Sequence, residues 1–293
     1  MRSLKLPALK DVFSNCLPLM NLTFYFLYIF VLGLEVGSFL NCVIYRLGKN
    51  ESFLKGRSYC PHCKHILSWK DLIPILSFLI LKGKCRYCHQ KISIQYPLVE
   101  LATGFIFLSI FNFQFSIFNQ LPIFNFQNSL TIIYLLLTTC FLITIFVYDL
   151  KYYIIPDKVI YPAILVAGSW QLVARIFLNL TTNHQLLTTI FSALGASAFF
   201  LLIFLISRGK WLGFGDVKLT FLMGLFLGFP NILIALFFAY FIGAIIGIGL
   251  IFAKKKTLKS EVPFGPFLVT GTFIALFFGN QIVNWYLRLI LTF

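Results

Sequence analysis

Long hydrophobic runs, separated by short polar segments, make up most of the chain. Runs close to or above the ~20 residues that an α-helix needs to cross a bilayer occur throughout the sequence. They predict eight membrane-spanning helices, at residues 22–44, 97–118, 130–148, 159–179, 186–206, 217–229, 231–253 and 266–290. The sixth run is the shortest and is followed by Pro230, which favours a short or tilted span. The pattern therefore predicts an all-α polytopic membrane protein.

Charged residues are rare and unevenly placed. They make up 11% of the chain against 59% hydrophobic residues, whereas an ordinary soluble domain carries about 25% charge. The net charge of +15 could indicate nucleic-acid binding, but basic residues on membrane proteins mark the cytoplasmic loops. With the amino terminus outside, the inside segments hold 19 of the 24 Lys and Arg. We therefore expect this orientation, with the basic loops against anionic lipid headgroups and no nucleic-acid partner.

Two domains follow from this topology. Residues 1–96 contain the first span and a large cytoplasmic loop, and residues 97–293 contain seven spans with short connections. No cleavable signal peptide is evident, because charged residues and Pro18 precede the first apolar run and no small-x-small site follows it. We therefore expect the first span to be an anchor.

Two Cys-x-x-Cys pairs lie in the predicted cytoplasmic loop. One pair is Cys60 and Cys63, the other is Cys85 and Cys88, and 21 residues separate the pairs. Each pair can form a tight knuckle with two thiolates, and two knuckles complete a tetrahedral site of the structural zinc type. A disulfide framework is disfavoured because the cytoplasm is reducing. Four sulfurs already close such a site, so we expect three nearby histidines to lie outside it: His62, His65 and His89.

The segment between the two pairs predicts one helix. Ser68 can cap a helix that runs from Trp69 to Lys82, with Asp71 at the capping-box position and Gly83 at its end. Its apolar face is too short to span a bilayer. We expect it to lie on the membrane surface or to pack against the bundle.

Acidic residues inside or at the edges of apolar spans are the second candidate for chemistry. The chain has only nine Asp and Glu, and four of them fall in such places: Glu35, Glu100, Asp149 and Asp216. A charged carboxylate is costly to bury there, which makes each one a functional candidate. Asp149 ends the third predicted span and Asp216 begins the sixth. The topology thus places these two at one depth on the cytoplasmic side.

Such a pair has a specific chemical use. Two carboxylates that approach closely cannot both ionise, so they share a proton, which aspartyl peptide hydrolysis requires. The ionised Asp takes a proton from water while its protonated partner polarises the scissile carbonyl. Gly213 and Gly215 would let the backbone approach a substrate strand, and Lys218 could bias the protonation of the pair. From the residues alone an alternative stays open, in which Asp216 caps its helix and Asp149 ends one in the headgroup layer.

Several segments join these features into one order along the chain: GSFLNCVIYRL (37–47), SWKDLIPILSFLILKGKCRYC (68–88), YPLVELATG (96–104), DLKYYIIPD (149–157), GFGDVKL (213–219) and VPFGPFL (262–268). Together they resemble the type IV prepilin peptidases, also called prepilin leader peptidase and N-methyltransferase, a group of GxGD membrane aspartyl proteases. GxGD alone is a weak signal, whereas its combination with Asp-x7-Asp and the four-cysteine loop is strong. One departure is Leu47-Gly48, where the family often has Leu-Pro.

The resemblance implies a bifunctional enzyme of the bacterial plasma membrane. The family cleaves the basic leader from prepilins and pseudopilin precursors at the cytoplasmic face after a glycine, and methylates the new amino terminus with S-adenosylmethionine. By position, Asp149 and Asp216 would be the catalytic aspartates, Asp157 would support them, and the four cysteines would bind zinc. A methyltransferase region is implied to include Gly37, Ser38, Asn41, Arg46 and Gly83. The residues alone do not predict methyl transfer, because no glycine fingerprint for a nucleotide-like cofactor occurs.

Recognition of a basic leader is not explained by the basic loop, since like charges repel. Electrostatic binding would need lipid headgroups or one of four acidic residues: Glu51, Asp71, Asp157 and Glu261. We expect the apolar helix of the precursor to dock between spans, which would bring the glycine junction to the aspartates.

Two other classes of protein are alternatives. An intramembrane protease of the presenilin or signal-peptide-peptidase type shares GxGD, but aspartates at the ends of spans and a preceding cysteine loop argue against it. A transporter that relays protons on its acidic residues predicts inverted repeats, and the sequence shows no such symmetry.

Overall fold

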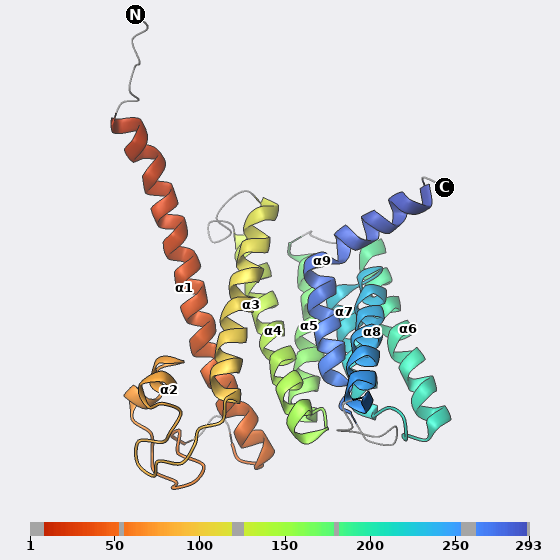
Figure 1. The fold of residues 1–293 in the computed structure, drawn as a ribbon. Coiled ribbons are helices and arrows are strands. Elements are labelled where there is room, and N and C mark those ends of the chain that lie inside the picture. Colours follow the sequence, from red (N-terminus) through yellow and green to blue (C-terminus); the bar gives the residue numbers. More distant parts are fainter. Residues whose placement is uncertain (1–8, 53–55, 119–125, 179–181, 253–261, 292–293) are drawn as a thin grey trace, which may run out of the picture. The chain divides into compact units, whose positions relative to one another are not determined.

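The computed structural model describes residues 9–52, 56–118, 126–178, 182–252 and 262–291, and within these ranges its regular elements are helices (Figure 1). In chain order they are α1 (Leu9–Gly48), η1 (Trp69–Asp71), α2 (Leu76–Ile80), α3 (Gln95–Phe118), α4 (Phe126–Tyr152), α5 (Asp157–Ile176), α6 (Asn183–Ser207), α7 (Phe214–Leu227), α8 (Asn231–Phe252) and α9 (Gly265–Leu291). Only two isolated β-bridges interrupt this pattern in the described residues, both in the segment between α1 and α3. The prediction of an all-α chain is confirmed.

Seven helices of the described chain are long and apolar enough to cross a membrane: Thr23–Gly48, Gln95–Ser116, Phe126–Tyr152, Asp157–Ile176, Asn183–Ser207, Asn231–Phe252 and Gly265–Ile290. They correspond to seven of the eight predicted spans. The sixth predicted span is α7, which has 14 residues and is therefore about 21 Å long, short of the ~30 Å hydrocarbon core. The chain is a multi-pass membrane protein.

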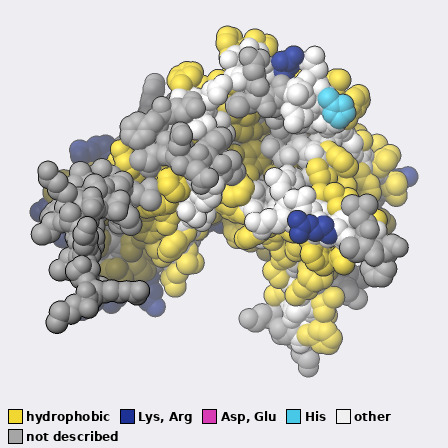
Figure 2. Space-filling model, turned by 90° about the horizontal axis from the view of Figure 1, so that it is seen from above, with side chains coloured by type: hydrophobic (Ala, Val, Ile, Leu, Met, Phe, Trp, Pro, Cys, Tyr) yellow, Lys and Arg dark blue, Asp and Glu magenta, His cyan; other side chains and the backbone are white. Residues whose placement is uncertain are grey.

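Hydrophobic side chains also dominate the outside of the molecule. They cover most of the described surface on the face shown in Figure 2, where basic side chains are few and no acidic side chain of a described residue is in view. Large apolar residues stand exposed along α6 and α8, for example Leu202 and Phe237. Lipid, rather than water, is the solvent that such surfaces fit.

The chain divides into two compact units, which we call the amino-terminal unit (Met1–Cys42 with Lys55–Leu136) and the carboxy-terminal unit (Val43–Leu54 with Leu137–Phe293). The division predicted from the sequence, into residues 1–96 and residues 97–293, separates two predicted activities rather than two compact units, and it stays a prediction.

An antiparallel seam between α1 and α3 organises the amino-terminal unit. Gly33 of α1 lies against Gly104 of α3, and Gly37 lies against Glu100 so closely that a Cβ on Gly37 would stand 2.7 Å from the Glu100 Cα. One turn further, the Asn41 side-chain amide donates to the Tyr96 carbonyl at 3.0 Å. Small residues four apart allow such close backbone approach in membranes, so the GLEVG segment sets the packing of this pair.

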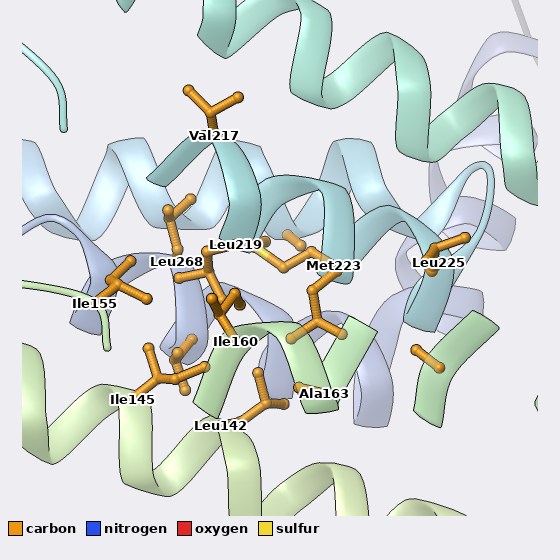
Figure 3. Packing of buried hydrophobic residues seen from close by; sticks show 14 of the residues in the cluster. Leu142, Ile145, Ile155, Ile160, Ala163, Val217, Leu219, Met223, Leu225 and Leu268 are labelled. Atoms are coloured by element: carbon orange, nitrogen blue, oxygen red, sulfur yellow. The ribbon is translucent and has the colours of Figure 1, made fainter. Parts of the chain in front are cut away.

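Helix α7 lies at the centre of the carboxy-terminal unit, in contact with α5, α6, α8 and α9. Its side chains Leu219, Leu222 and Met223 are fully buried and belong to the apolar cluster drawn in Figure 3. A Cβ on Gly224 would overlap the backbone of Ala193 in α6, so this short helix is closely surrounded. Burial on all sides explains how a helix too short to span is nevertheless held in place.

The helix predicted from Trp69 to Lys82 is wrong as a continuous element. Only η1 and α2 form, and Ile75 between them has φ 60° and ψ −50°, outside the helical region. Pro74 interrupts the helix, because it has no N–H to donate and disfavours helical backbone at Ile73, the residue before it. The Asp71 half of the predicted capping box is present, since Asp71 Oδ2 accepts the Ser68 N–H; the Ser68 hydroxyl donates to the same oxygen, and the Asp71 N–H donates to the Ser68 carbonyl.

Candidate functional site

Asp149 lies in the last turn of α4, at the point where the chain leaves the helix. The Asp149 carbonyl accepts the N–H of Tyr153, a residue with φ 60°, and the chain then turns toward α5. The Asp149 side chain is 4% exposed, and its Oδ2 accepts the backbone N–H of Gly265 at 3.0 Å. Gly265 is the first residue of α9, where helical N–H groups have no partner within the helix. The start of α9 is therefore what holds this carboxylate.

Asp216 occupies the corresponding position at the start of α7. It is 8% exposed, and its Oδ2 accepts the N–H of the N-cap residue Gly213 at 3.1 Å. This is the helix-capping contact of the alternative interpretation. It uses one oxygen of the carboxylate, so capping and a chemical role are compatible.

The fold brings these two carboxylates together although 67 positions separate them in the chain. They are near enough for a Coulombic interaction. The side chain of Ile155, which follows α4, packs against both Gly215 and Gly265. A Cβ on Gly215 would stand 2.9 Å from the Ile155 Cβ, and a Cβ on Gly265 would stand 3.5 Å from the Ile155 Cδ1. Two buried carboxylates in this relationship can hold one proton between them, which is the arrangement for general acid and base catalysis.

Lys218 forms an ion pair with Asp157 at the start of α5. Its Nζ lies 2.6 Å from Oδ1 of Asp157, and above the rings of Tyr161 and Phe214 at 4.8 Å and 5.1 Å. The Asp157 side chain is 61% exposed. This ion pair ties the starts of α5 and α7 at the surface, and it engages Asp157, one of the acidic residues considered for leader binding.

The four cysteines form one cluster. Their sulfur atoms all lie within 4.8 Å of one another, so they can hold a metal ion, and the sulfurs of Cys60 and Cys88 are 3.9 Å apart. A backbone hydrogen bond from Gln90 lowers the pKa of the Cys88 thiol, but burial and the neighbouring thiols outweigh it and raise that pKa to about 11. A metal must therefore displace protons from this cluster to bind.

Both Cys-x-x-Cys pairs fold into the same knuckle. The N–H of Cys60 donates to the carbonyl of His65 and that of Lys64 donates to Cys60, while Cys85 and His89 make the equivalent bonds with Gln90 and Cys85. Lys64 and His89 each have positive φ, which closes the tight turn. Among the described residues, no histidine belongs to the metal cluster, and His65 instead stacks on Tyr87 with ring centroids 3.7 Å apart.

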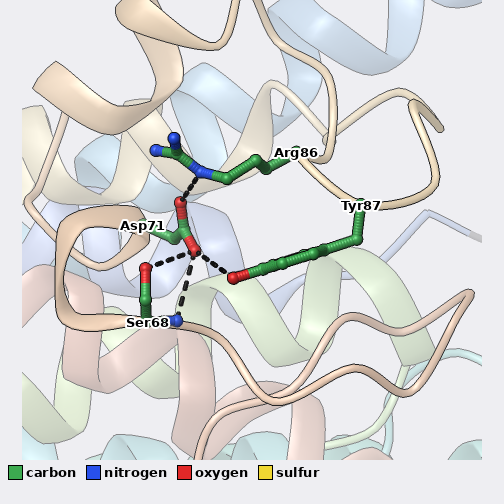
Figure 4. Close-up of polar contacts among 4 residues, drawn as sticks. All are labelled: Ser68, Asp71, Arg86 and Tyr87. Atoms are coloured by element: carbon green, nitrogen blue, oxygen red, sulfur yellow. Dashed lines mark hydrogen bonds and ion pairs between the residues drawn. The ribbon is translucent and has the colours of Figure 1, made fainter.

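Asp71 joins the capping box to the second knuckle (Figure 4). Its Oδ1 accepts from Arg86 Nε at 2.7 Å, and its Oδ2 accepts from the Tyr87 hydroxyl at 3.3 Å as well as from Ser68. Burial opposes ionisation of this carboxyl, but the hydrogen bonds from Ser68 and Arg86 outweigh it and lower its pKa. Asp71 is therefore committed to holding the loop, which leaves little of it for a leader peptide.

The residues implied for methyl transfer are only partly brought together. Gly37, Ser38 and Asn41 lie along the α1 side of the seam, whereas Gly83 lies in the cysteine loop with φ 69° and packs against Phe78. Arg46 is 5% exposed and donates to the Ser52 carbonyl at 3.1 Å in the last turn of α1, within the carboxy-terminal unit. Gly37 has a structural reason to be glycine, since α3 leaves no room for a Cβ.

The sequence interpretation gave no role to Ile155 or Gly265, and it did not predict that Glu100 accepts the N–H of Ile75 in the cysteine loop. Gly265 lies in the VPFGPFL segment and Glu100 was noted only as an acid in a span. Nothing in the local sequence links Gly265 to Asp149, because the contact crosses 116 positions. Glu261, a further candidate for leader binding, lies outside the described residues.

The architecture defines a class: a multi-pass membrane protein with two buried carboxylates brought together at helix ends and a separate four-cysteine loop. Comparison with known families makes the assignment specific. Residues 31–113 match the model of the bacterial peptidase A24 amino-terminal domain, and residues 136–248 match that of the type IV leader peptidase family. The chain belongs to the type IV leader peptidase family.

Several curated relatives carry the name prepilin leader peptidase/N-methyltransferase. The one from Aeromonas hydrophila is 30% identical over 294 residues, which covers 90% of this chain and 94% of the relative. That from Bacillus subtilis (strain 168) is 30% identical over 265 residues, with coverage of 90% and 98%, and that from Legionella pneumophila is 30% identical over 288 residues, with coverage of 90% and 95%. No solved structure matches the chain significantly.

Proposed function

We propose that this chain is a prepilin leader peptidase and N-methyltransferase, which cleaves the leader of prepilin and pseudopilin precursors and methylates the new amino terminus. The observation that carries the peptidase half is the pair Asp149 and Asp216, which lie near each other in the fold, each buried and each held by a glycine N–H. Relatives that cover nearly the whole chain carry both activities in their names.

In the proposed mechanism the two aspartates share one proton. The ionised carboxylate takes a proton from water, which attacks the scissile carbonyl, while the protonated partner donates a hydrogen bond to the carbonyl oxygen. The partner roles then reverse, and a carboxyl protonates the leaving amine. The hydrogen bonds from Gly265 and Gly213 each occupy an Oδ2, so they orient the carboxylates without blocking both oxygens.

The position of the pair indicates where the substrate is cut. Asp149 is in the last turn of α4 and Asp216 in the first turn of α7, at helix ends rather than at the middle of a span. We propose that the scissile bond reaches the aspartates at the membrane rim. Because basic residues mark the cytoplasmic side, this rim is the cytoplasmic one, and the amino terminus lies outside a bacterial inner membrane.

The amino-terminal unit is the proposed place of methyl transfer. The two family models divide the chain so that the aspartates fall in the second, which leaves the first for the other named activity. Asn41 is 2% exposed and its Oδ1 has no partner among the described residues, so it can accept a hydrogen bond from a ligand. Ser38 and Asn41 are the residues proposed to hold S-adenosylmethionine, which supplies the methyl group when bound.

Zinc is the metal proposed for the cysteine cluster. Tetrahedral zinc with four bonds of about 2.3 Å to sulfur places the sulfurs about 3.8 Å apart, and the Cys60 to Cys88 separation of 3.9 Å fits this value. Four thiolates close the coordination shell, so the ion stabilises the fold of the loop and takes no part in catalysis.

The test is a reconstituted reaction. The purified protein in lipid vesicles is given a pilin-like precursor and S-adenosylmethionine, and the product is measured by mass spectrometry. We expect a precursor shortened at a glycine junction and carrying one added methyl group. An intact precursor would refute the peptidase, and a shortened but unmethylated one would refute the methyltransferase.

A further inference from the structure

Glu100 is a buried acid that the proposed mechanism does not use. It lies in α3, within a membrane-spanning helix, and is 7% exposed. A carboxylate at such a site needs partners. The partners of Glu100 are hydrogen-bond donors: the backbone N–H of Ile75, at 2.8 Å from Oε2, and the hydroxyl of Ser38.

Ile75, which donates this hydrogen bond, has an unusual backbone conformation. With φ 60° and ψ −50° it forms a γ-turn, in which the N–H of Leu76 donates to the carbonyl of Pro74. Turns of this hand are rare and strained, and a β-branched residue with positive φ adds to the strain. Strained backbone persists only where its surroundings impose it. Among the described residues, Glu100 lies outside the loop and holds this turn by accepting the Ile75 N–H.

The same carboxylate reaches the seam between α1 and α3. Ser38, its second donor, stands next to Gly37, whose backbone touches Glu100, and Asn41 lies one turn further along α1. Glu100 thus joins the cysteine loop to the residues proposed to hold the methyl donor. All of these residues belong to the amino-terminal unit.

We propose that Glu100 is a positioning residue for methyl transfer: oriented by Ser38, it fixes the cysteine loop against the α1 and α3 seam by accepting the Ile75 N–H and holding the strained turn. The proposal rests on the proposed methyltransferase activity. It predicts that loss of Glu100 frees the loop and impairs methylation, while cleavage, which depends on aspartates in the other unit, continues.

The test compares Glu100→Ala, Glu100→Gln and a matched control, Ser109→Ala. Ser109 is exposed on the same helix and its hydroxyl donates only locally, to the Phe105 carbonyl. Three rates are measured in vesicles: amide hydrogen exchange at Ile75, cleavage of one precursor, and methylation of the same precursor. For Glu100→Ala we expect amide exchange at Ile75 to become faster and methylation to become slower, each by about tenfold or more, because a charged hydrogen-bond acceptor is lost. The cleavage rate should stay nearly unchanged.

The conservative variant separates positioning from general damage. Glutamine keeps an acceptor oxygen for the Ile75 N–H, so Glu100→Gln should retain most of the protection and most of the methylation. Glycine tolerates positive φ, so Ile75→Gly combined with Glu100→Ala should recover part of the methylation lost in the single variant. If Glu100→Ala does not accumulate in the membrane, the comparison of Glu100→Gln with Ser109→Ala still tests the proposal, because Glu100→Gln should keep the amide of Ile75 protected and methylation close to that of the control.

Two results would overturn the proposal. One is unchanged exchange at Ile75 in Glu100→Ala, and the other is an equal loss of cleavage and methylation in every Glu100 variant. A wild-type protein that does not methylate at all is a different failure, because it refutes the proposed function before any variant is compared.

Discussion

The backbone N–H of Gly265 donates a hydrogen bond to Oδ2 of Asp149 across a distance of 3.0 Å. This contact joins the start of α9 to the end of α4, and it places a helix N-terminus against one of the two proposed catalytic carboxylates. A helix N-terminus favours a negative charge nearby. The site is therefore assembled from three separate segments, and substitutions in each of them should affect cleavage.

Replacement of either aspartate tests the pair directly. Asp149→Asn and Asp216→Asn should each lower the cleavage rate by at least about 100-fold, because each removes a general acid or base. Methylation of a precursor that is already cleaved should persist. Asp157→Asn is the control, since it removes an exposed ion pair and should change cleavage by less than about tenfold. A fully active Asp149→Asn or Asp216→Asn would refute the proposed roles.

The two glycines of the GFGD segment should respond differently. A Cβ on Gly215 would stand 2.9 Å from the Ile155 Cβ, whereas the nearest atom to one on Gly213 is 3.5 Å away. Gly215→Ala should therefore force the segment away from Ile155 and impair cleavage, while Gly213→Ala should keep most of the activity. The measurement is the initial cleavage rate at equal amounts of membrane-inserted protein. Equal effects of the two changes would contradict the packing described.

Gly265→Ala should displace Asp149. Its Cβ would stand 2.5 Å from Asp149 Oδ2, and a misplacement of about 1 Å can cost on the order of 100-fold in rate. The matched control is Gly249→Ala in α8, where the added Cβ meets no atom within 4 Å. We expect cleavage to fall in the first variant alone, with precursor binding retained.

Removal of cysteines should remove the metal. Elemental analysis of the purified protein should give one zinc per chain, and Cys60→Ser or Cys88→Ser should abolish it, because three thiolates leave the tetrahedral shell open. Cys140→Ser is the control, since Cys140 lies in α4 outside the cluster. The purified wild type should contain no disulfide among these four cysteines, and detection of one would contradict the reducing side assigned to the loop.

Asp71 should make the loop sensitive to acid. The pKa of Asp71 is lowered in the folded protein. Its contribution to the stability of the loop is therefore fully present above the ordinary carboxyl pKa of about 3.9, and it is lost as the pH falls through the lower pKa of the folded state. At neutral pH, Asp71→Asn should destabilise the loop by about 1–3 kcal/mol, seen as faster amide exchange at Ser68. The difference between variant and wild type should shrink below pH 4. A difference that does not depend on pH would contradict an ionised role.

Some features of this protein depend on local pattern and could be predicted from the sequence. Hydrophobic runs of bilayer length predict seven of the spans, because the backbone of each run must satisfy its hydrogen bonds within its own helix. The remaining predicted run forms α7, a buried helix too short to cross a bilayer. The spacing of the cysteines predicts two equivalent knuckles, because each closes through hydrogen bonds within a few residues. Asp149 and Asp216 could be identified as candidates because the cost of burying a carboxylate at the end of a span can be inferred from the position of that single residue.

Other features were decided only by the tertiary structure. Lys218 pairs with Asp157 rather than with the buried aspartates, and Gly265 and Glu100 acquire their partners from distant segments. None of these follows from spacing, because each depends on which helices pack together and on which backbone groups remain unpaired when they do. Sequence pattern thus determined which groups could do chemistry, and packing determined which of them meet.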